Sequence, residues 1–264
     1  MATKAAPILE RILQSRRAAI EELKASGAEN GLQQSIAAAP APRDFRQALL
    51  RSGRVALIAE CKERSPSGGL LQPSYDPVSL ARRYEANGAA AISVLVEPEF
   101  FGGSLDHLQA VRSAVEVPIL CKDFIIDPIQ VLAARAAGAD AVLLIVGLLE
   151  AGTLRSLQAL ATQLSMQAVV EVHSEEELHR ALRADAGIIG INNRDLTRMK
   201  TDRETTARLR PLIPAGRVVI SESGIESRAD VDELRRLRVD AVLVGESLLR
   251  AADLAAKVRE LSGA

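Results

Sequence analysis

The chain has 264 residues, of which 48% are apolar and 25% charged, so it can bury a full hydrophobic core and is neither disordered nor fibrous. Its net charge is −1, with acidic and basic residues interspersed. We expect no nucleic-acid or membrane partner, because both usually require a basic excess.

The N-terminal part is predicted to hold two helices joined by a stiff linker. Residues 8–24 carry apolar side chains at helical spacing, and residues 44–50 fit a second, shorter helix. Residues 37–42, made of alanine and proline, form the linker. Since residues 1–52 are too few to own a core, we expect them to be a helical extension packed on a catalytic barrel of residues 53–264.

From residue 55 onward, short β-branched runs alternate with longer segments of helical period, at the spacing of βα units. Strands that are nearly all apolar are buried on both faces, which is typical of a parallel sheet. Eight such units predict an α/β fold, a single (β/α)8 TIM barrel. The eight runs are residues 55–61, 90–96, 117–121, 141–146, 167–172, 187–191, 218–221 and 241–244.

Helix ends are marked at several junctions. Gly88 and Gly138 fit left-handed positions that end a helix before the next strand. Asp76 and Asp127 each precede a proline, as an N-cap precedes the first helical residue. Ser174 begins a predicted capping box, with the acidic side chain three residues later closing it.

The cysteines, the N-terminal residues and the length of the apolar runs bear on the cellular compartment of the protein. Cys61 and Cys121 lie in apolar runs, as buried thiols of a reducing compartment do, and no Cys/His cluster suggests structural zinc. Residues 1–9 lack the pattern of a secretory signal, and the longest apolar run, residues 139–149, is too short to span a bilayer. We expect a cytoplasmic protein.

Charged and amide side chains end nearly every predicted strand. In such barrels chemistry takes place at the C-terminal ends of the strands. One such charge would be interpreted as a solvated rim residue, but so many inside otherwise apolar sequence indicate a site. Glu60 and Lys62 lie two residues apart and therefore face the same way. The set is Glu60, Lys62, Glu97, Lys122, Asp123, Glu171, Asn192, Arg194 and Glu222.

Two glycine segments follow the last two strands. They are residues 223–225, with Gly224, and residues 244–247, with Gly245. Loops at these positions often bind phosphate through free backbone N–H groups and a helix N-terminus. The three histidines are not grouped: His107 and His179 fall on predicted helices, and His173 either faces the mouth or, as we favour, is a hydrogen-bonded loop residue. We predict no metal site.

These residues resemble the indole-3-glycerol phosphate synthase family. Residues 58–68 contain a Glu-x-Lys-x-x-Ser-Pro-Ser core that begins at Glu60, and residues 190–196 read Gly-Ile-Asn-Asn-Arg-Asp-Leu. Two positions depart from the family pattern, Glu63 in place of a basic or small polar residue and Val96 in place of a threonine. Further similar segments follow in the same order, at residues 93–95, 118–124, 170–172, 221–225 and 244–246.

The resemblance implies a reaction. The family's substrate is an anthranilate joined through nitrogen to an open-chain deoxyribulose phosphate, and the enzyme closes the pyrrole ring, then releases carbon dioxide and water. No cofactor is implied, because the iminium formed on ring closure accepts the electrons released by decarboxylation. The implied partners are this small phosphorylated substrate and functional neighbours in the tryptophan pathway.

The resemblance also implies roles. Lys122 protonates the ketone oxygen, Lys62 lies near the carboxylate and phosphate of the substrate, and Glu222 orients the lysines. Glu60 and Glu171 are alternative bases. The remaining implied contacts are Asn192 and Arg194, which position the substrate, and Ser65, Ser223, Gly224, Gly245 and Glu246 on the phosphate side.

Three other functions stay open at this point. A Schiff-base aldolase would use Lys122 or Lys62 as a nucleophile on the same fold. A phosphate-binding protein without activity would have no reason to keep six polar strand-end residues together. Another barrel enzyme acting on a phosphoribosyl compound is the nearest alternative.

Overall fold

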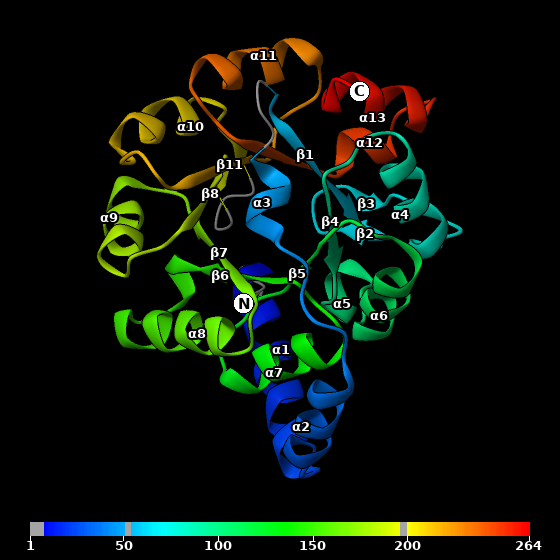
Figure 1. Cartoon of the computed structure of the whole chain (residues 1–264), viewed down its shortest axis with the longest axis vertical. Coiled ribbons are helices and arrows are strands. Elements are labelled where there is room, and N and C mark those ends of the chain that lie inside the picture. The colour runs from blue at the N-terminus through cyan, green and yellow to red at the C-terminus, as the bar shows by residue number, and fades with distance from the viewer. Residues whose placement is uncertain (1–7, 51–53, 196–199) are drawn as a thin grey trace, which may run out of the picture.

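The computed structural model describes residues 8–50, 54–195 and 200–264. Within these residues eight parallel strands close into a barrel, in the order β1, β12, β11, β8, β7, β6, β5 and β4 (Figure 1). The predicted TIM barrel is confirmed, and no strand end lies more than two residues from its predicted place. The strands are β1 Ala56–Cys61, β4 Ala91–Leu95, β5 Ile119–Lys122, β6 Ala141–Ile145, β7 Gln167–Val172, β8 Ile188–Asn192, β11 Val218–Glu222 and β12 Ala241–Val244.

Helices surround the barrel and connect its strands (Figure 1). The longer ones are α4 Pro77–Ala86, α6 Leu105–Ala114, α7 Pro128–Ala136, α8 Ala151–Gln163, α9 Glu175–Arg183, α10 Glu204–Leu209, α11 Arg228–Arg236 and α13 Leu254–Ser262. Short elements lie in the loops between them: β2 Arg64–Ser65, β3 Gly69–Leu70, α5 Pro98–Phe101, η1 Val146–Leu148, β9 Arg194–Asp195, β10 Lys200–Thr201, η2 Arg210–Leu212 and α12 Glu246–Leu249.

Alternate residues of each strand belong to two different apolar clusters. On β1, Leu57 and Ala59 pack outward against the helices, whereas Ala56 and Ile58 pack toward the barrel axis. The same alternation places one inward residue of each neighbouring strand at a similar height, as the pairing of Ile58 with Leu243 of β12 shows. The period of two therefore decides which strand-end side chains reach the barrel mouth.

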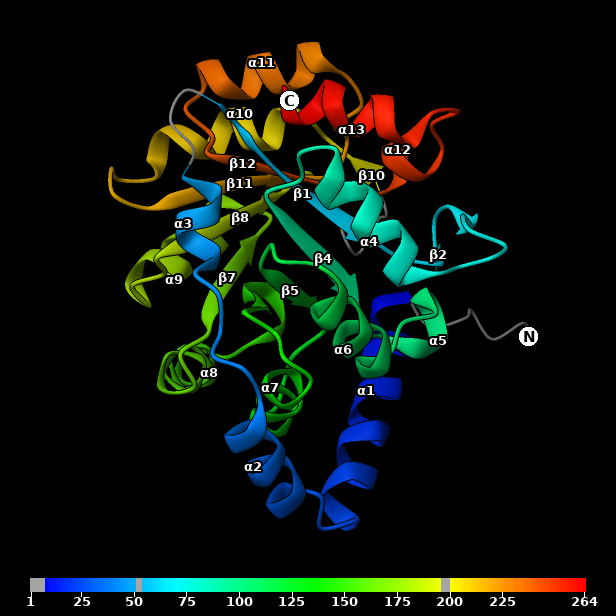
Figure 2. The same ribbon diagram turned by 45° about the vertical axis from the view of Figure 1, so that its right-hand side comes forward.

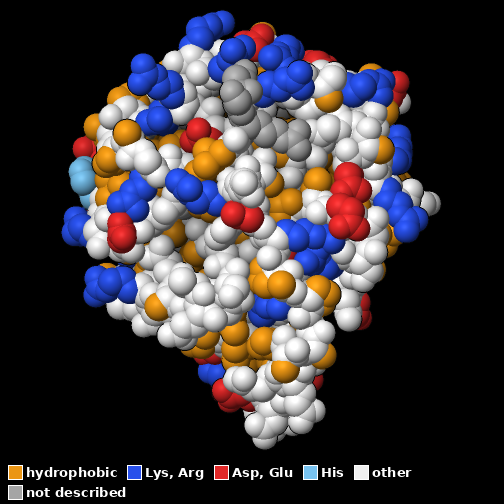
Figure 3. Space-filling model, in the orientation of Figure 1, with side chains coloured by type: hydrophobic (Ala, Val, Ile, Leu, Met, Phe, Trp, Pro, Cys, Tyr) orange, Lys and Arg blue, Asp and Glu red, His pale blue; other side chains and the backbone are white. Residues whose placement is uncertain are grey.

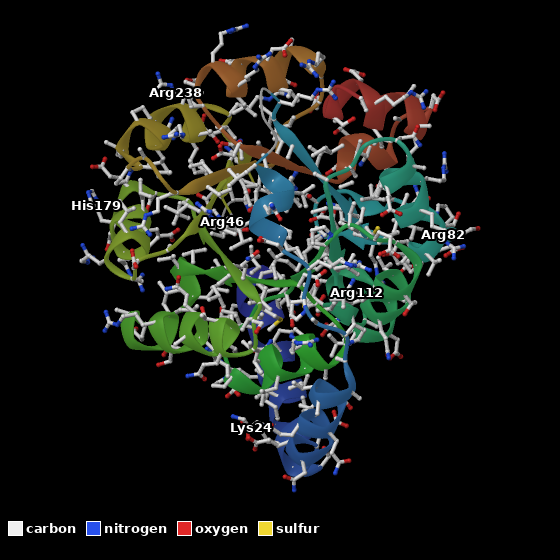
Figure 4. The ribbon with its side chains drawn as sticks, viewed as in Figure 1. Lys24, Arg46, Arg82, Arg112, His179 and Arg238 are labelled. Atoms are coloured by element: carbon white, nitrogen blue, oxygen red, sulfur yellow. The ribbon has the colours of Figure 1, made fainter. Side chains whose placement is uncertain are left out.

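The N-terminal segment packs on both ends of the barrel. It contains α1 Ile8–Ala25, α2 Glu29–Ala38 and α3 Phe45–Leu49. Phe45 and Leu49 are fully buried against the first residues of the strands. Arg46 lies between them on α3 (Figure 4), and its backbone N–H donates to Gln167 Oε1 at 2.7 Å. At the opposite end, α1 lies beside α5 (Figure 2), where Arg16 binds Asp123 at 2.7 Å.

One expectation for this segment was wrong. The linker predicted at residues 37–42 begins inside α2, which the sequence analysis did not predict; the extended chain starts only at residue 39. The helix carries few apolar residues, so its amphipathic signal is weak, and its packing against α7 stabilises it. The proposed boundary between residues 52 and 53 lies outside the described residues and stays a prediction.

The predicted helix caps are present, with one correction. Gly88 and Gly138 have φ values of +100° and +93°, in the left-handed region. The Asp76 and Asp127 side chains accept backbone N–H groups at the starts of α4 and α7. Ser174 caps α9, but the box is not closed, because the Glu177 carboxylate accepts the N–H of His173 instead.

The surface around α3 carries charges of both signs. Lys and Arg side chains are spread over this face, with Asp and Glu among them (Figure 3). No helix in the described part of the chain is long and apolar enough to cross a membrane.

Candidate active site

A cavity of about 690 Å³ opens at the C-terminal ends of the strands. Every residue to which the resemblance assigns a role lines it: Glu60, Lys62, Ser65, Lys122, Glu171, Asn192, Arg194, Glu222, Ser223, Gly224, Gly245 and Glu246. The structure therefore brings these residues together at one cavity, although they come from the C-terminal ends of six strands and the segments that follow them. Leu196, the last residue of one quoted motif, lies outside the described residues.

Strand parity explains this convergence. Glu60, Lys122 and Glu171 each lie two residues after an inward apolar residue of the same strand. Each polar side chain thus continues a column of core residues and emerges at its top. The Glu222 side chain lies against Gly190 of β8, which pairs with Ile220 of β11, and a Cβ atom at Gly190 would lie 2.5 Å from Glu222 Oε1.

Glu60 and Lys62 form a close ion pair. The Lys62 Nζ lies 2.5 Å from Glu60 Oε1, and Glu60 is 6% exposed. Burial raises the pKa of Glu60, but attraction to the Lys62 and Lys122 ammonium groups outweighs it, and the pKa ends below its ordinary value. The carboxylate is therefore ionised at neutral pH, and its negative charge partly offsets the positive charge of the Lys62 ammonium beside it.

Lys122 lies between two buried carboxylates. Its Nζ is 3.3 Å from Glu171 Oε2 and 3.5 Å from Glu222 Oε2. Burial lowers the pKa of Lys122, but Glu171, Glu222 and Glu60 together raise it well above its ordinary value. Lys122 is thus a fully protonated ammonium, able to donate a proton to a strongly basic oxygen.

The two carboxylates beside Lys122 differ in charge. Burial raises the pKa of Glu171, but Lys122 and His173 outweigh it and lower the pKa below its usual range. Burial and repulsion from Glu171 and Glu60 raise the pKa of Glu222 to about 8, against the attraction of Lys122. Since two adjacent buried carboxylates rarely ionise together, Glu171 holds the charge and Glu222 holds the proton.

Asn192 and Arg194 are fixed by their surroundings. Asn192 Oδ1 accepts the backbone N–H of Arg194 at 3.0 Å and the hydroxyl of Ser223 at 2.8 Å. The Arg194 guanidinium donates to the Ser67 hydroxyl and lies 3.7 Å from the Glu246 carboxylate. Arg194 therefore joins the loop after β1 to the loop after β12.

The proposed phosphate side is built from tight turns. Ser223 and Gly224 both adopt left-handed conformations, with φ values of +69° and +77°, so the backbone turns sharply at the end of β11. At Gly245, a Cβ atom would lie 2.5 Å from Glu60 Oε1 and 3.0 Å from Lys62 Nζ. The glycine thus leaves room for the ion pair beside it, a relation that the sequence analysis did not predict.

Several cavity residues were missed. An apolar wall of Leu95, Phe101, Phe124, Leu143 and Ile145 faces the charged groups. Nothing in the sequence separates these residues from core positions, because they continue the same inward columns or follow a strand end. Arg203, Arg250 and Lys257 also line the cavity and add positive charge on the phosphate side.

Two other charged residues at strand ends, Glu97 and Asp123, bind groups of the protein itself. Glu97 is fully buried and accepts three backbone N–H groups at the start of α5. Asp123 lines the cavity but is held by Arg16 of α1. Glu63, one of the two departures from the family pattern, lies against Gly102, while Val96 is buried in the core.

The histidines and cysteines mostly follow expectation. His179 is exposed and points outward from α9 (Figure 4). His107 is on α6 but half-buried, with its ring against Tyr75, so its predicted surface position was wrong in part. Cys61 and Cys121 are free and buried. Among the described residues no group of three His, Cys, Asp or Glu side chains is arranged to hold a metal ion.

The chain was compared with protein families and with known proteins of similar sequence. Residues 9–261 match the sequence model of a family described as indole-3-glycerol phosphate synthase. A protein of that name from Roseiflexus sp. strain RS-1 is 49% identical over 97% of this chain and 98% of its own length. Another, from Desulforamulus reducens, is 47% identical over 96% of both chains.

The fold of the chain is also similar to that of solved structures. The crystal structure of 3-hexulose-6-phosphate synthase from Salmonella typhimurium superposes with a TM-score of 0.65 at 17% identity. The match covers 79% of this chain and 97% of the other. At this level of identity the comparison supports the barrel alone.

Proposed function

This chain belongs to the indole-3-glycerol phosphate synthase family, carboxy-lyases of tryptophan biosynthesis, and from that premise we propose how its residues carry out the reaction. The substrate is 1-(2-carboxyphenylamino)-1-deoxyribulose 5-phosphate, and the products are indole-3-glycerol phosphate, carbon dioxide and water. The observation that carries the proposal is the placement of the Lys122 ammonium between Glu171 and Glu222, beside an apolar wall.

The proposed orientation of the substrate follows from the two sides of the cavity. The anthranilate ring packs on the apolar wall, near Phe124 and Leu143, because burial of an aromatic face is favourable there. The phosphate lies at the turns around Gly224 and Gly245, with Arg203 and Lys257 supplying positive charge. The ketone then lies between these ends, within reach of the lysines.

Lys122 acts as the general acid in ring closure. Attack of the ring carbon on the ketone builds negative charge on the oxygen, and a nearby ammonium neutralises it by proton transfer. An alkoxide is a stronger base than an amine, so a raised lysine pKa does not prevent this transfer. Decarboxylation follows, with the iminium nitrogen accepting the electron pair.

The carboxylates and Lys62 complete the cycle. Either Glu171 or Glu60, both ionised, removes the proton needed for aromatisation, while Lys62 binds the substrate carboxylate and assists departure of the hydroxyl group. Asn192 and Arg194 hold the sugar hydroxyls and close the site toward the loop after β1. No cofactor takes part in the proposed cycle, and full activity after exhaustive dialysis against EDTA would support this.

The aldolase alternative is disfavoured by electrostatics. A Schiff-base lysine must lose its proton, which enzymes achieve by surrounding it with apolar or positively charged groups. Lys122 instead faces three carboxylates that raise its pKa. Borohydride trapping with substrate would give a covalent adduct with an aldolase and none with the enzyme proposed here.

We also propose a cytoplasmic location and a small phosphorylated substrate as the main partner, with neighbouring enzymes of the tryptophan pathway as functional associates. The direct test of function is to incubate the protein with the carboxyphenylamino sugar phosphate and follow indole fluorescence. The chain contains no tryptophan, so product emission is measured against a dark background. Absence of product at micromolar enzyme would overturn the proposal.

A further inference from the structure

His173 lies directly behind Glu171, outside the residues that line the described cavity. Its Nε2 is 3.2 Å from Glu171 Oε1, the carboxylate oxygen that faces away from Lys122. The two atoms are buried and not aligned for a hydrogen bond, so their attraction is that of an ion pair. Glu171 is therefore held between two cationic groups, Lys122 on the cavity side and His173 on the other.

A second carboxylate fixes His173 in this position. Glu177 of α9 accepts the backbone N–H of His173 at 2.7 Å, and its Oε2 lies 3.1 Å from the ring Nδ1. The Glu177 carboxylate fits against η1 because residue 147 is glycine, where a Cβ atom would lie 2.7 Å from Glu177 Oε1. Both ring nitrogens thus face carboxylates, as expected for a doubly protonated imidazolium.

The charged groups around the pair of carboxylates are few. Against Glu171 lie Lys122 of β5, His173, and Glu222 of β11, while Glu222 faces Lys122, Glu171 and Glu60 of β1. Lys122 is close to both carboxylates, but it donates a hydrogen bond to Glu171 and makes only an ion pair with Glu222. Of the two carboxylates His173 contacts only Glu171, so it adds a second cation on the side of the pair where Lys122 and Asn192 already favour the charged form.

We propose that His173 is a positioning residue which assigns the negative charge of the carboxylate pair to Glu171 and leaves the proton on Glu222. The inference rests on the proposed function and takes Glu171, rather than Glu60, as the ionised base beside Lys122. Burial would lower the pKa of His173, but Glu171 and Glu177 raise it to about 10, so the imidazolium persists over the working range of pH. Without this cation, the proton held by Glu222 is shared with Glu171, and the base is partly neutralised.

The unaltered protein offers the first test. Ring resonances of the histidines are followed by NMR from pH 5 to 10.5, with His107→Asn and His179→Asn used to assign signals. We expect His173 to stay protonated through pH 9. Loss of its proton between about pH 6 and 7, as in an isolated histidine, would overturn the inference.

The kinetic test uses His173→Asn, with His179→Asn as the matched surface control. We expect kcat/KM of His173→Asn to fall about tenfold near pH 6, one pKa unit of lost discrimination. The loss shrinks toward pH 9, because removing the cation raises the pKa of Glu171 and high pH then strips the misplaced proton. A loss equal at every pH, or none, would contradict the proposal.

A double variant separates this inference from the proposed function. If His173 acts through Glu171, adding His173→Asn to Glu171→Gln causes no further loss of kcat. Additive losses would assign His173 a merely structural role. A normal His173→Asn beside an impaired Glu171→Gln would overturn this inference alone, whereas a wild-type rate in Glu171→Gln would overturn the role of Glu171 in the proposed function as well.

Discussion

Replacing Gly245 by alanine should impair catalysis more than it impairs folding. The added Cβ would lie 2.5 Å from Glu60 Oε1, about 0.9 Å short of the 3.4 Å at which ordinary contact begins, and 3.0 Å from Lys62 Nζ. Both atoms end flexible side chains, so the chain can fold while the pair is displaced. A misplacement of about 1 Å costs on the order of 10²-fold in rate, so we expect kcat to fall by roughly that factor.

The assay is steady-state indole fluorescence together with thermal unfolding followed by circular dichroism. We expect a melting temperature close to that of the wild type, a lowered kcat and a raised KM, since the phosphate is proposed to approach the same turn. Gly187→Ala is the matched control, because nothing lies within 4 Å of a Cβ at that position. A kcat within twofold of wild type in Gly245→Ala would refute the claim that the Glu60–Lys62 geometry matters.

Four further substitutions test charge and stability. Glu60→Gln and Glu171→Gln should each lower kcat by about 10²–10⁴-fold at unchanged binding of a non-reacting analogue, measured by calorimetry, if each acts as a base; wild-type rates in both would show that neither is a base. Glu222→Gln should gain thermal stability relative to wild type as pH rises from 5 to 8. In the folded wild type the pKa of Glu222 is about 8, above its ordinary value, so the folded protein holds a proton that the unfolded chain releases. The stability of the wild type therefore falls across that pH range, whereas the variant has no such proton to lose. A gap that stays constant with pH would contradict this proton assignment. Asp140→Ala should cost about 3 kcal/mol of unfolding free energy in urea, because it leaves two backbone N–H groups without their acceptor and the buried Arg112 without its carboxylate partner; a loss below about 1 kcal/mol would show that water replaces the carboxylate.

The polar half of the site was predictable from sequence because two regular patterns combine. The apolar runs locate the strands, and the period of two then points Glu60, Lys122 and Glu171 inward at the strand ends. The closed barrel brings these ends together, although their positions in sequence are far apart. The assignment therefore needed no knowledge of loop structure.

The apolar half and the residues behind it were not predictable in this way. Phe101 and Phe124 follow strand ends in loops, where the sequence pattern does not distinguish a substrate wall from a covered core. The contact of His173 with Glu177 depends on how α9 starts. The predicted capping box would have the Glu177 carboxylate accept the N–H of Ser174, whereas in the structure it accepts the N–H of His173. The helix α2 was missed because tertiary packing, not its own pattern, holds it.

The central claim is that Lys122 protonates the ketone oxygen during ring closure. Single-turnover experiments on Lys122→Ala and Lys122→Arg, with ring closure, carbon dioxide release and product formation measured separately, test it most directly. We predict that both variants bind a substrate analogue with modestly changed Kd and fail at ring closure, because guanidinium keeps the charge but yields its proton poorly. Lys62→Ala should lose affinity as well as rate. Ring closure at the normal rate in Lys122→Ala would contradict the account and leave Lys62 as the acid.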